Sequence, residues 1–78
     1  MKCKELFNEN HIDRVIVEDH KGNIFSTYTP GIDFDYVINN LQGNFLKLSH
    51  IYLRTVHMSS LRYREVIFEV EPEREANI

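Results

Sequence analysis

The chain contains one cysteine, three glycines and no long apolar run, and each shortage excludes a class of protein. The lone Cys3 cannot form an internal disulfide or a Cys-x-x-Cys pair, so we expect a reducing, cytoplasmic compartment. No apolar stretch approaches the roughly 18 residues that a membrane span needs, and the first residues lack the apolar segment of a signal peptide. We therefore expect no membrane association.

The same shortages argue against catalysis and against a bound cofactor. The glycines are dispersed at Gly22, Gly31 and Gly43 and form no phosphate-binding loop. The four histidines lack metal-ligand spacing, and no acidic loop resembles a calcium site. Cys3 lies near the end of the chain, where nothing in the sequence would fix the geometry of a nucleophile. The sequence predicts a protein that is not an enzyme and that has no metal or cofactor.

The composition is that of a small globular domain. The 78 residues are 42% hydrophobic and 27% charged, which fits a single domain over residues 1–78. A chain this short buries only about 60% of the surface that its unfolded form exposes, so its core is small. Nine Lys and Arg against twelve Asp and Glu give a net charge of −3, which disfavours coating nucleic acid by bulk charge.

The first half of the chain predicts a hairpin. β-branched residues over 12–18 and 24–29 indicate two strands. A turn over 19–23 joins them and would place Val17 opposite Phe25.

A short amphipathic helix is expected next, over 33–42. Asp33 is a favourable N-cap, and Gly43 is expected to end the helix in the left-handed conformation. One apolar stripe at helical spacing consists of Phe34, Val37, Ile38 and Leu41.

A second hairpin is expected over 45–57 and 62–71, with its turn at Ser59-Ser60. The apolar alternation slips by one residue near Ser49-His50, which is typical of a β-bulge. A single register of the two strands gives favourable cross-strand pairs on both faces of this hairpin. It pairs Ile51 with Phe68, Leu53 with Val66, Arg54 with Glu65, His50 with Glu69, Tyr52 with Ile67 and Val56 with Tyr63.

The predicted fold is therefore α+β with the element order β-β-α-β-β. It consists of a small antiparallel β-sheet with one short amphipathic helix on one face. The charged tail over 72–78 is expected to be frayed.

Basic residues gather around the second hairpin and form a positive end on an acidic molecule. They are Lys47, His50, Arg54, His57, Arg62 and Arg64. In the expected register no acidic residue faces Arg62 or Arg64, so these two can bind phosphates. The alternative is that the charges form solvated cross-strand pairs without a binding role.

A second candidate site is the face of this hairpin that is turned away from the helix. It carries an apolar and aromatic strip of Tyr52, Val56, Tyr63 and Ile67. Contiguous exposed patches of this kind usually mark protein contacts, so the strip indicates a homodimer or a protein partner. Alternatively, the N-terminal segment covers it through Leu6 and Phe7.

The segment 45–56 resembles the signature strand of LytTR-type DNA-binding domains. That family shows an aromatic–apolar–basic–apolar run, then a His or Ser, a basic residue and a Ser, and an ending of the form apolar-Val-Asn-apolar. The matching positions are Phe45, Leu46, Lys47, Leu48, Ser49, His50, Leu53 and Val56. The helix and the strand before this segment are also similar to the family's elements, so the resemblance covers about residues 24–58. The sequence departs from the signature at Ile51, Arg54 and Thr55.

The resemblance implies a non-enzymatic regulator of transcription that binds double-stranded DNA. Members of the family insert the loops between their strands into successive major grooves. On this hypothesis phosphates are bound by Lys47, His50, Arg62 and Arg64, and base edges are approached by Arg54, Thr55 or His57. The alternative hypothesis is a small protein-interaction module or homodimer acting through the apolar strip.

Overall fold

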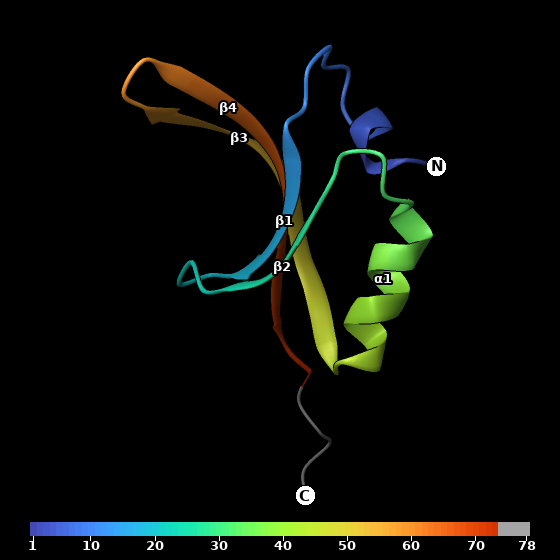
Figure 1. Ribbon diagram of the computed structural model, residues 1–78. Helices are drawn as coiled ribbons and strands as arrows, with labels where there is room; N and C mark the ends of the chain where they lie inside the picture. Colours follow the sequence, from blue (N-terminus) through green and yellow to red (C-terminus); the bar gives the residue numbers. More distant parts are fainter. Residues whose placement is uncertain (74–78) are drawn as a thin grey trace, which may run out of the picture.

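The computed structural model describes residues 1–73 and has the expected order of elements (Figure 1). The elements are a 3₁₀ turn η1 (Cys3–Glu5), strands β1 (Arg14–Asp19) and β2 (Ile24–Tyr28), helix α1 (Phe34–Gly43), and strands β3 (Leu46–Met58) and β4 (Leu61–Pro72). One helix lies on one side of a four-stranded sheet. The predicted α+β class and the order β-β-α-β-β are confirmed.

The sheet is mixed, because the two hairpins meet through a parallel pair. Its strand order is β2-β1-β4-β3, with β1 parallel to β4 in the centre and antiparallel pairs on either side. The connection through α1 carries the chain from one edge of the sheet to the other, and β4 then returns beside β1. A central parallel pair is covered on both faces, which explains the unbroken apolar runs Val15–Val17 and Val66–Phe68.

The register predicted for the second hairpin is confirmed in every pair from His50–Glu69 to Met58–Leu61. The bulge also lies where the alternation slips, between Leu48 and His50. The Ser49 hydroxyl donates to the carbonyl oxygen of Glu69 at 3.0 Å.

The register predicted for the first hairpin is wrong by one residue. Val17 pairs with Ser26 instead of Phe25, because a bulge lies between the pairs Val17–Ser26 and Glu18–Ile24. Phe25 is the extra residue, and its side chain is exposed.

Helix α1 begins as predicted and ends differently. Asp33 is the N-cap and accepts a hydrogen bond from the Asp35 amide at 3.1 Å, and the predicted stripe packs on the sheet through buried Val37 and Leu41. Gly43 is still helical. The left-handed conformation that was expected there occurs at Phe45, with φ of 58°.

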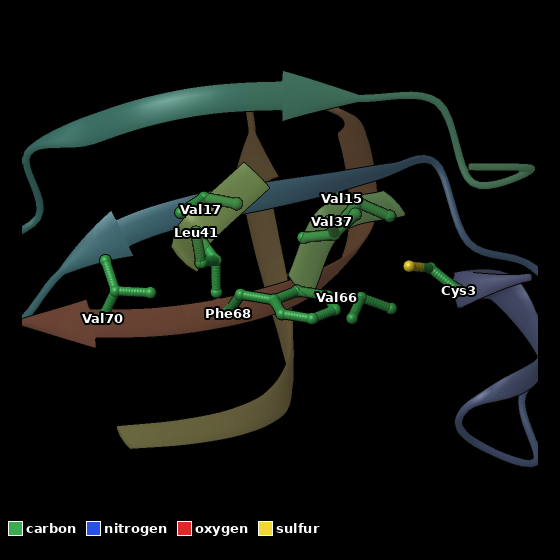
Figure 2. Close-up of a cluster of buried hydrophobic side chains, with 8 residues drawn as sticks. All are labelled: Cys3, Val15, Val17, Val37, Leu41, Val66, Phe68 and Val70. Atoms are coloured by element: carbon green, nitrogen blue, oxygen red, sulfur yellow. The ribbon is translucent and has the colours of Figure 1, made fainter. Parts of the chain in front are cut away.

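The core lies between α1 and the sheet (Figure 2). It consists of Cys3, Val15, Val17, Val37, Leu41, Val66, Phe68 and Val70. The N-terminal segment belongs to this side of the sheet, since Leu6 and Phe7 pack against the core and the Cys3 amide donates to the Ile32 carbonyl oxygen at 2.8 Å. The suggestion that Leu6 and Phe7 cover the opposite face is therefore wrong.

The first two residues of the predicted frayed tail, Pro72 and Glu73, are held at the sheet. Pro72 pairs with Leu46 in the sheet, and the Glu73 amide donates to the Phe45 carbonyl oxygen at 2.8 Å. The rest of the predicted tail, residues 74–78, lies outside the described residues. Within residues 1–73, no helix is both long enough and apolar enough to cross a membrane.

Candidate functional site

Strands β3 and β4 continue past the end of β1 as a two-stranded arm, residues 55–64. The last three-stranded row contains Arg14, Glu65 and Arg54. Beyond it, in the part of the chain that the structure describes, no third strand joins the four β3–β4 pairs from Thr55–Arg64 to Met58–Leu61. At about 3.4 Å per residue the arm is about 13 Å long. Figure 1 shows it projecting from the body of the sheet.

The arm has two chemically different faces, because directly opposite residues of an antiparallel pair point to the same side. The basic face consists of Thr55, His57, Arg62 and Arg64. The apolar face consists of Val56, Met58, Leu61 and Tyr63. The arm contains no acidic residue, since the sequence has none between Asp35 and Glu65.

Arg62 and His57 form the outer row of the basic face. Both side chains are exposed, and Arg62 makes no ion pair with any residue that the structure describes. The turn beyond them is made by Ser59 and Ser60, with Ser59 at φ of 56° as the primed hairpin turns require at their first position. The outer row is therefore open to a ligand on the basic face.

Arg64 is held at the base of the arm by the N-terminal segment. Its guanidinium binds Glu9 at 2.5 Å and also donates to the Thr55 hydroxyl, and its amide donates to Asp13 Oδ2 at 2.8 Å. The hydrogen bond from Arg64 holds the pKa of Glu9 below its usual value, and the Arg64 amide does the same for the pKa of Asp13. The prediction that Arg64 lacks an acidic partner is wrong, because the partner comes from a distant segment that the hairpin register does not include.

The other predicted nucleic-acid contacts lie away from the basic face. Arg54 points to the opposite side of the sheet and binds Glu65 and Glu18. Burial alone would lower the pKa of Arg54, but the hydrogen bonds with Glu18 and Glu65 outweigh it and raise that pKa. Lys47 precedes His57 by ten residues of β3, about 33 Å along the strand. His50 stacks on Tyr52 with ring centroids 5.1 Å apart.

The predicted apolar strip is interrupted. The Arg54–Glu65 row lies between the Tyr52–Ile67 row and the Val56–Tyr63 row, so the four side chains do not form one surface. Ile67 is 0% exposed, and the prediction that it belongs to an exposed strip is wrong. The Arg14 guanidinium carbon lies 4.9 Å from the centroid of the Tyr63 ring and covers part of that side chain.

Two exposed residues that the sequence analysis missed lie at the tip of the apolar face. Met58 and Leu61 pair with each other beside the turn, and each is 56% exposed. The signal that could have found them is their position, because a hairpin tip that extends past its sheet has nothing to pack against.

The remaining reactive group, the Cys3 thiol, is buried. Burial, with a smaller contribution from the Asp33 carboxylate, raises its pKa to about 11, and the N-terminal ammonium partly opposes both effects. The thiol is therefore protonated at neutral pH and is a poor nucleophile. Among residues 1–73, no group of three or more His, Cys, Asp or Glu side chains is arranged to hold a metal ion.

Comparisons of the chain with protein-family models, with curated proteins and with solved structures give no match. Its function must therefore be inferred from the arm and from the side chains that the fold brings together there.

Proposed function

We propose that the protein is a non-enzymatic DNA-binding regulator that inserts its β3–β4 arm into the major groove. The observation that carries the proposal is the outer row of the arm's basic face, where Arg62 and His57 are exposed and the arm itself supplies no acidic residue. The major groove is about 12 Å wide and about 8.5 Å deep and admits a two-stranded β-ribbon. An arm about 13 Å long can therefore reach the base edges. The resemblance to LytTR-type domains also supports this function, since that family uses the connections between its strands.

Two rows of the basic face have different roles in the proposal. His57 and Arg62 lie nearest the tip, so they enter the groove and approach base edges. Thr55 and Arg64 lie at the base of the arm, toward the phosphates that border the groove. Because its guanidinium is bound to Glu9, Arg64 can contact a phosphate only by leaving that carboxylate. Arg54 takes no part, because its guanidinium is occupied by Glu18 and Glu65.

The distribution of charge is compatible with DNA binding in spite of the net charge of −3. All acidic residues lie at or before Asp35 and at or after Glu65, outside the arm. Repulsion from DNA phosphates therefore acts mainly on the body of the sheet and favours an approach with the arm leading.

Selection from random DNA duplexes at about 0.1 M salt tests this function directly. We expect one sequence motif to be enriched over successive rounds. Binding of the selected duplex should then fall with salt, with a log–log slope of about −1.8 if two phosphates are contacted.

Two single-charge variants on the same hairpin locate the contact. Arg62→Ala should weaken binding and relax sequence preference, since a good base contact contributes about 1–3 kcal/mol of discrimination. Lys47→Ala removes an equal charge from the distant end of β3 and should leave affinity nearly unchanged. Equal losses in both variants would mean that the arm is not the contact, and failure to enrich any motif would contradict base readout.

The apolar face of the arm favours a second candidate function, a protein-interaction module or homodimer. Met58 and Leu61 expose an apolar tip that DNA backbone contacts would not require. Leu61→Lys separates the two functions, because it adds a positive charge while removing an apolar side chain. DNA binding should persist or strengthen in this variant, whereas a protein contact through the apolar face should be lost.

A further inference from the structure

Within residues 1–73, the strand order leaves β2 and β3 as the two edges of the sheet, and these edges differ in charge. An edge strand pairs readily with another chain unless charges, proline or a twist protect it. β3 is protected by the basic residues Lys47 and His57, which lie toward its two ends. β2 also has a bulge, at Phe25, but it has neither a charged residue nor a proline, and the uncharged stretch around it covers residues 22–32.

Exposed apolar side chains lie on and beside the uncharged edge strand β2. Ile24 is 59% exposed and Phe25 is 50% exposed. Tyr36 of α1 is also exposed and packs edge-on against Tyr28 of β2, with ring centroids 6.2 Å apart. The edge therefore continues into an aromatic surface on the helix side of the sheet.

A cavity of about 300 Å³ adjoins the same strand. Phe25, Ser26 and Tyr28 of β2 line it, together with Asn40 and Leu41 of α1. It lies between β2 and the helix, so a strand added to the edge of β2 would lie along its mouth.

We propose that β2 pairs antiparallel with β2 of a second copy of this chain, around a twofold axis perpendicular to the sheet. The two sheets then form one continuous sheet with both helices on the same face. Each Phe25 lies on the helix side of the joined sheet, against the cavity wall of the other copy.

The distribution of charge favours a second copy of this chain as the partner that pairs with β2. In a twofold pairing each strand meets itself, so a charged strand would bring like charges together. The same pairing at β3 would bring Lys47, His50 and His57 into the contact of both copies. Two molecules with a net charge of −3 repel each other over most of their surface, and the stretch 22–32 is a segment where they can meet without such repulsion.

Sedimentation equilibrium between about 10 µM and about 1 mM tests the proposal, since weak dimers dissociate in this range. We expect the wild-type protein to dimerise, and Phe25→Lys to raise the dissociation constant at least about tenfold. Met58→Lys is the matched control, because it also replaces a half-exposed apolar side chain by lysine but lies on the arm. It should leave the dissociation constant unchanged.

Hydrogen exchange gives a second measurement that needs no variant. The amides of β2 that face outward should exchange more slowly at the high end of the concentration range than at the low end, while those at the arm tip should not change. If circular dichroism shows that Phe25→Lys does not fold, Ile24→Lys replaces it.

Three results would overturn the proposal. The protein could remain monomeric throughout the range, or Phe25→Lys and Met58→Lys could weaken association equally. Association could also be lost in Met58→Lys alone, which would assign the contact to the apolar face of the arm. None of these results depends on whether the protein binds DNA.

Discussion

Arg54 of β3 reaches across β4 to bind Glu18 of β1 with both terminal nitrogens, at 2.9 and 3.1 Å. The same guanidinium binds Glu65 of β4, which is also bound by Arg14. Glu18 is 6% exposed and Glu65 is 2% exposed. This network lies on the sheet face opposite helix α1, over the row where Ile16 and Ile67 are buried. The arginine side chains therefore cover the central strands where a second layer of structure would otherwise be needed.

Removing the shared cation should destabilise the fold. Arg54→Ala leaves Glu18 without a salt-bridge partner among residues 1–73, and breaking a buried ion pair on one side costs more than the pair contributes. We expect the free energy of unfolding to fall by about 2–3 kcal/mol, since Arg54 is itself partly in water and Glu65 keeps Arg14. Urea denaturation measures this loss. Arg62→Ala, on the exposed arm, should change stability by less than about 0.5 kcal/mol, and a similar loss in both variants would contradict the network's role.

Ile67 should behave as a core residue, although it lies on the sheet face opposite helix α1. Ile67→Ala should cost about 2–5 kcal/mol. Ile67→Glu should abolish folding, because an unpaired carboxylate would be buried beside Glu65. Leu61→Glu places the same charge on the exposed arm and should retain the wild-type circular dichroism spectrum. A folded Ile67→Glu variant would show that the Arg54 network opens easily.

The Cys3 thiol should react slowly with disulfide reagents in the folded protein. At pH 8 it is protonated and buried, so we expect modification to require unfolding and to become fast in denaturant. Its pKa of about 11 in the fold lies above the ordinary value of 9.0. Stability from this group is therefore complete below pH 9 and is lost as the pH rises toward 11. The Cys3→Ala variant should therefore lose less stability than the wild type as the pH rises from 9 to 11. Rapid labelling of the folded protein would contradict the burial of the thiol.

Acid should destabilise the protein through carboxylates whose pKa values the fold lowers. The N-terminal ammonium lowers the pKa of Asp33, and the Asn23 side chain lowers that of Asp19. Below about pH 4 the unfolded chain then binds more protons than the folded chain, so stability falls as the pH decreases. Thermal melts between pH 7 and pH 3 measure this fall. Asp33→Asn keeps an N-cap but loses the ion pair with Met1, so the melting temperature of this variant should fall less between pH 7 and pH 3. A fall equal to that of the wild type would show that the ion pair makes no contribution.

Much of the second hairpin follows from the sequence, including its register and its bulge. The turn that joins β3 and β4 fixes their register, so Arg54 faces Glu65 and Leu53 faces Val66. A slip of one residue would move the side chains of one strand to the other face of the sheet, which would break both pairs. The first hairpin gave no such signal. Ile24 and Phe25 are both apolar, and the polar residues Ser26 and Thr27 follow, so no alternation marked the bulge.

The candidate site was predicted only in part. The sequence identified His57, Arg62 and Arg64 as a local basic group, and the arm places them on one face with Thr55. It could not show that Arg54 also binds Glu18 of β1 in a buried network, because β1 lies outside the hairpin.

The sequence by itself determined the helix, the turn at Ser59-Ser60 and the antiparallel pairing of β3 with β4. These features depend on spacings within a few residues or across one turn. Tertiary structure alone decided the parallel pairing of β1 with β4, the contact of Arg64 with Glu9 and the burial of Cys3. Such contacts join segments far apart in the chain, so no local period records them. They form only when the helix connection carries β3 and β4 back beside β1, and that return also leaves the arm free beyond the last three-stranded row.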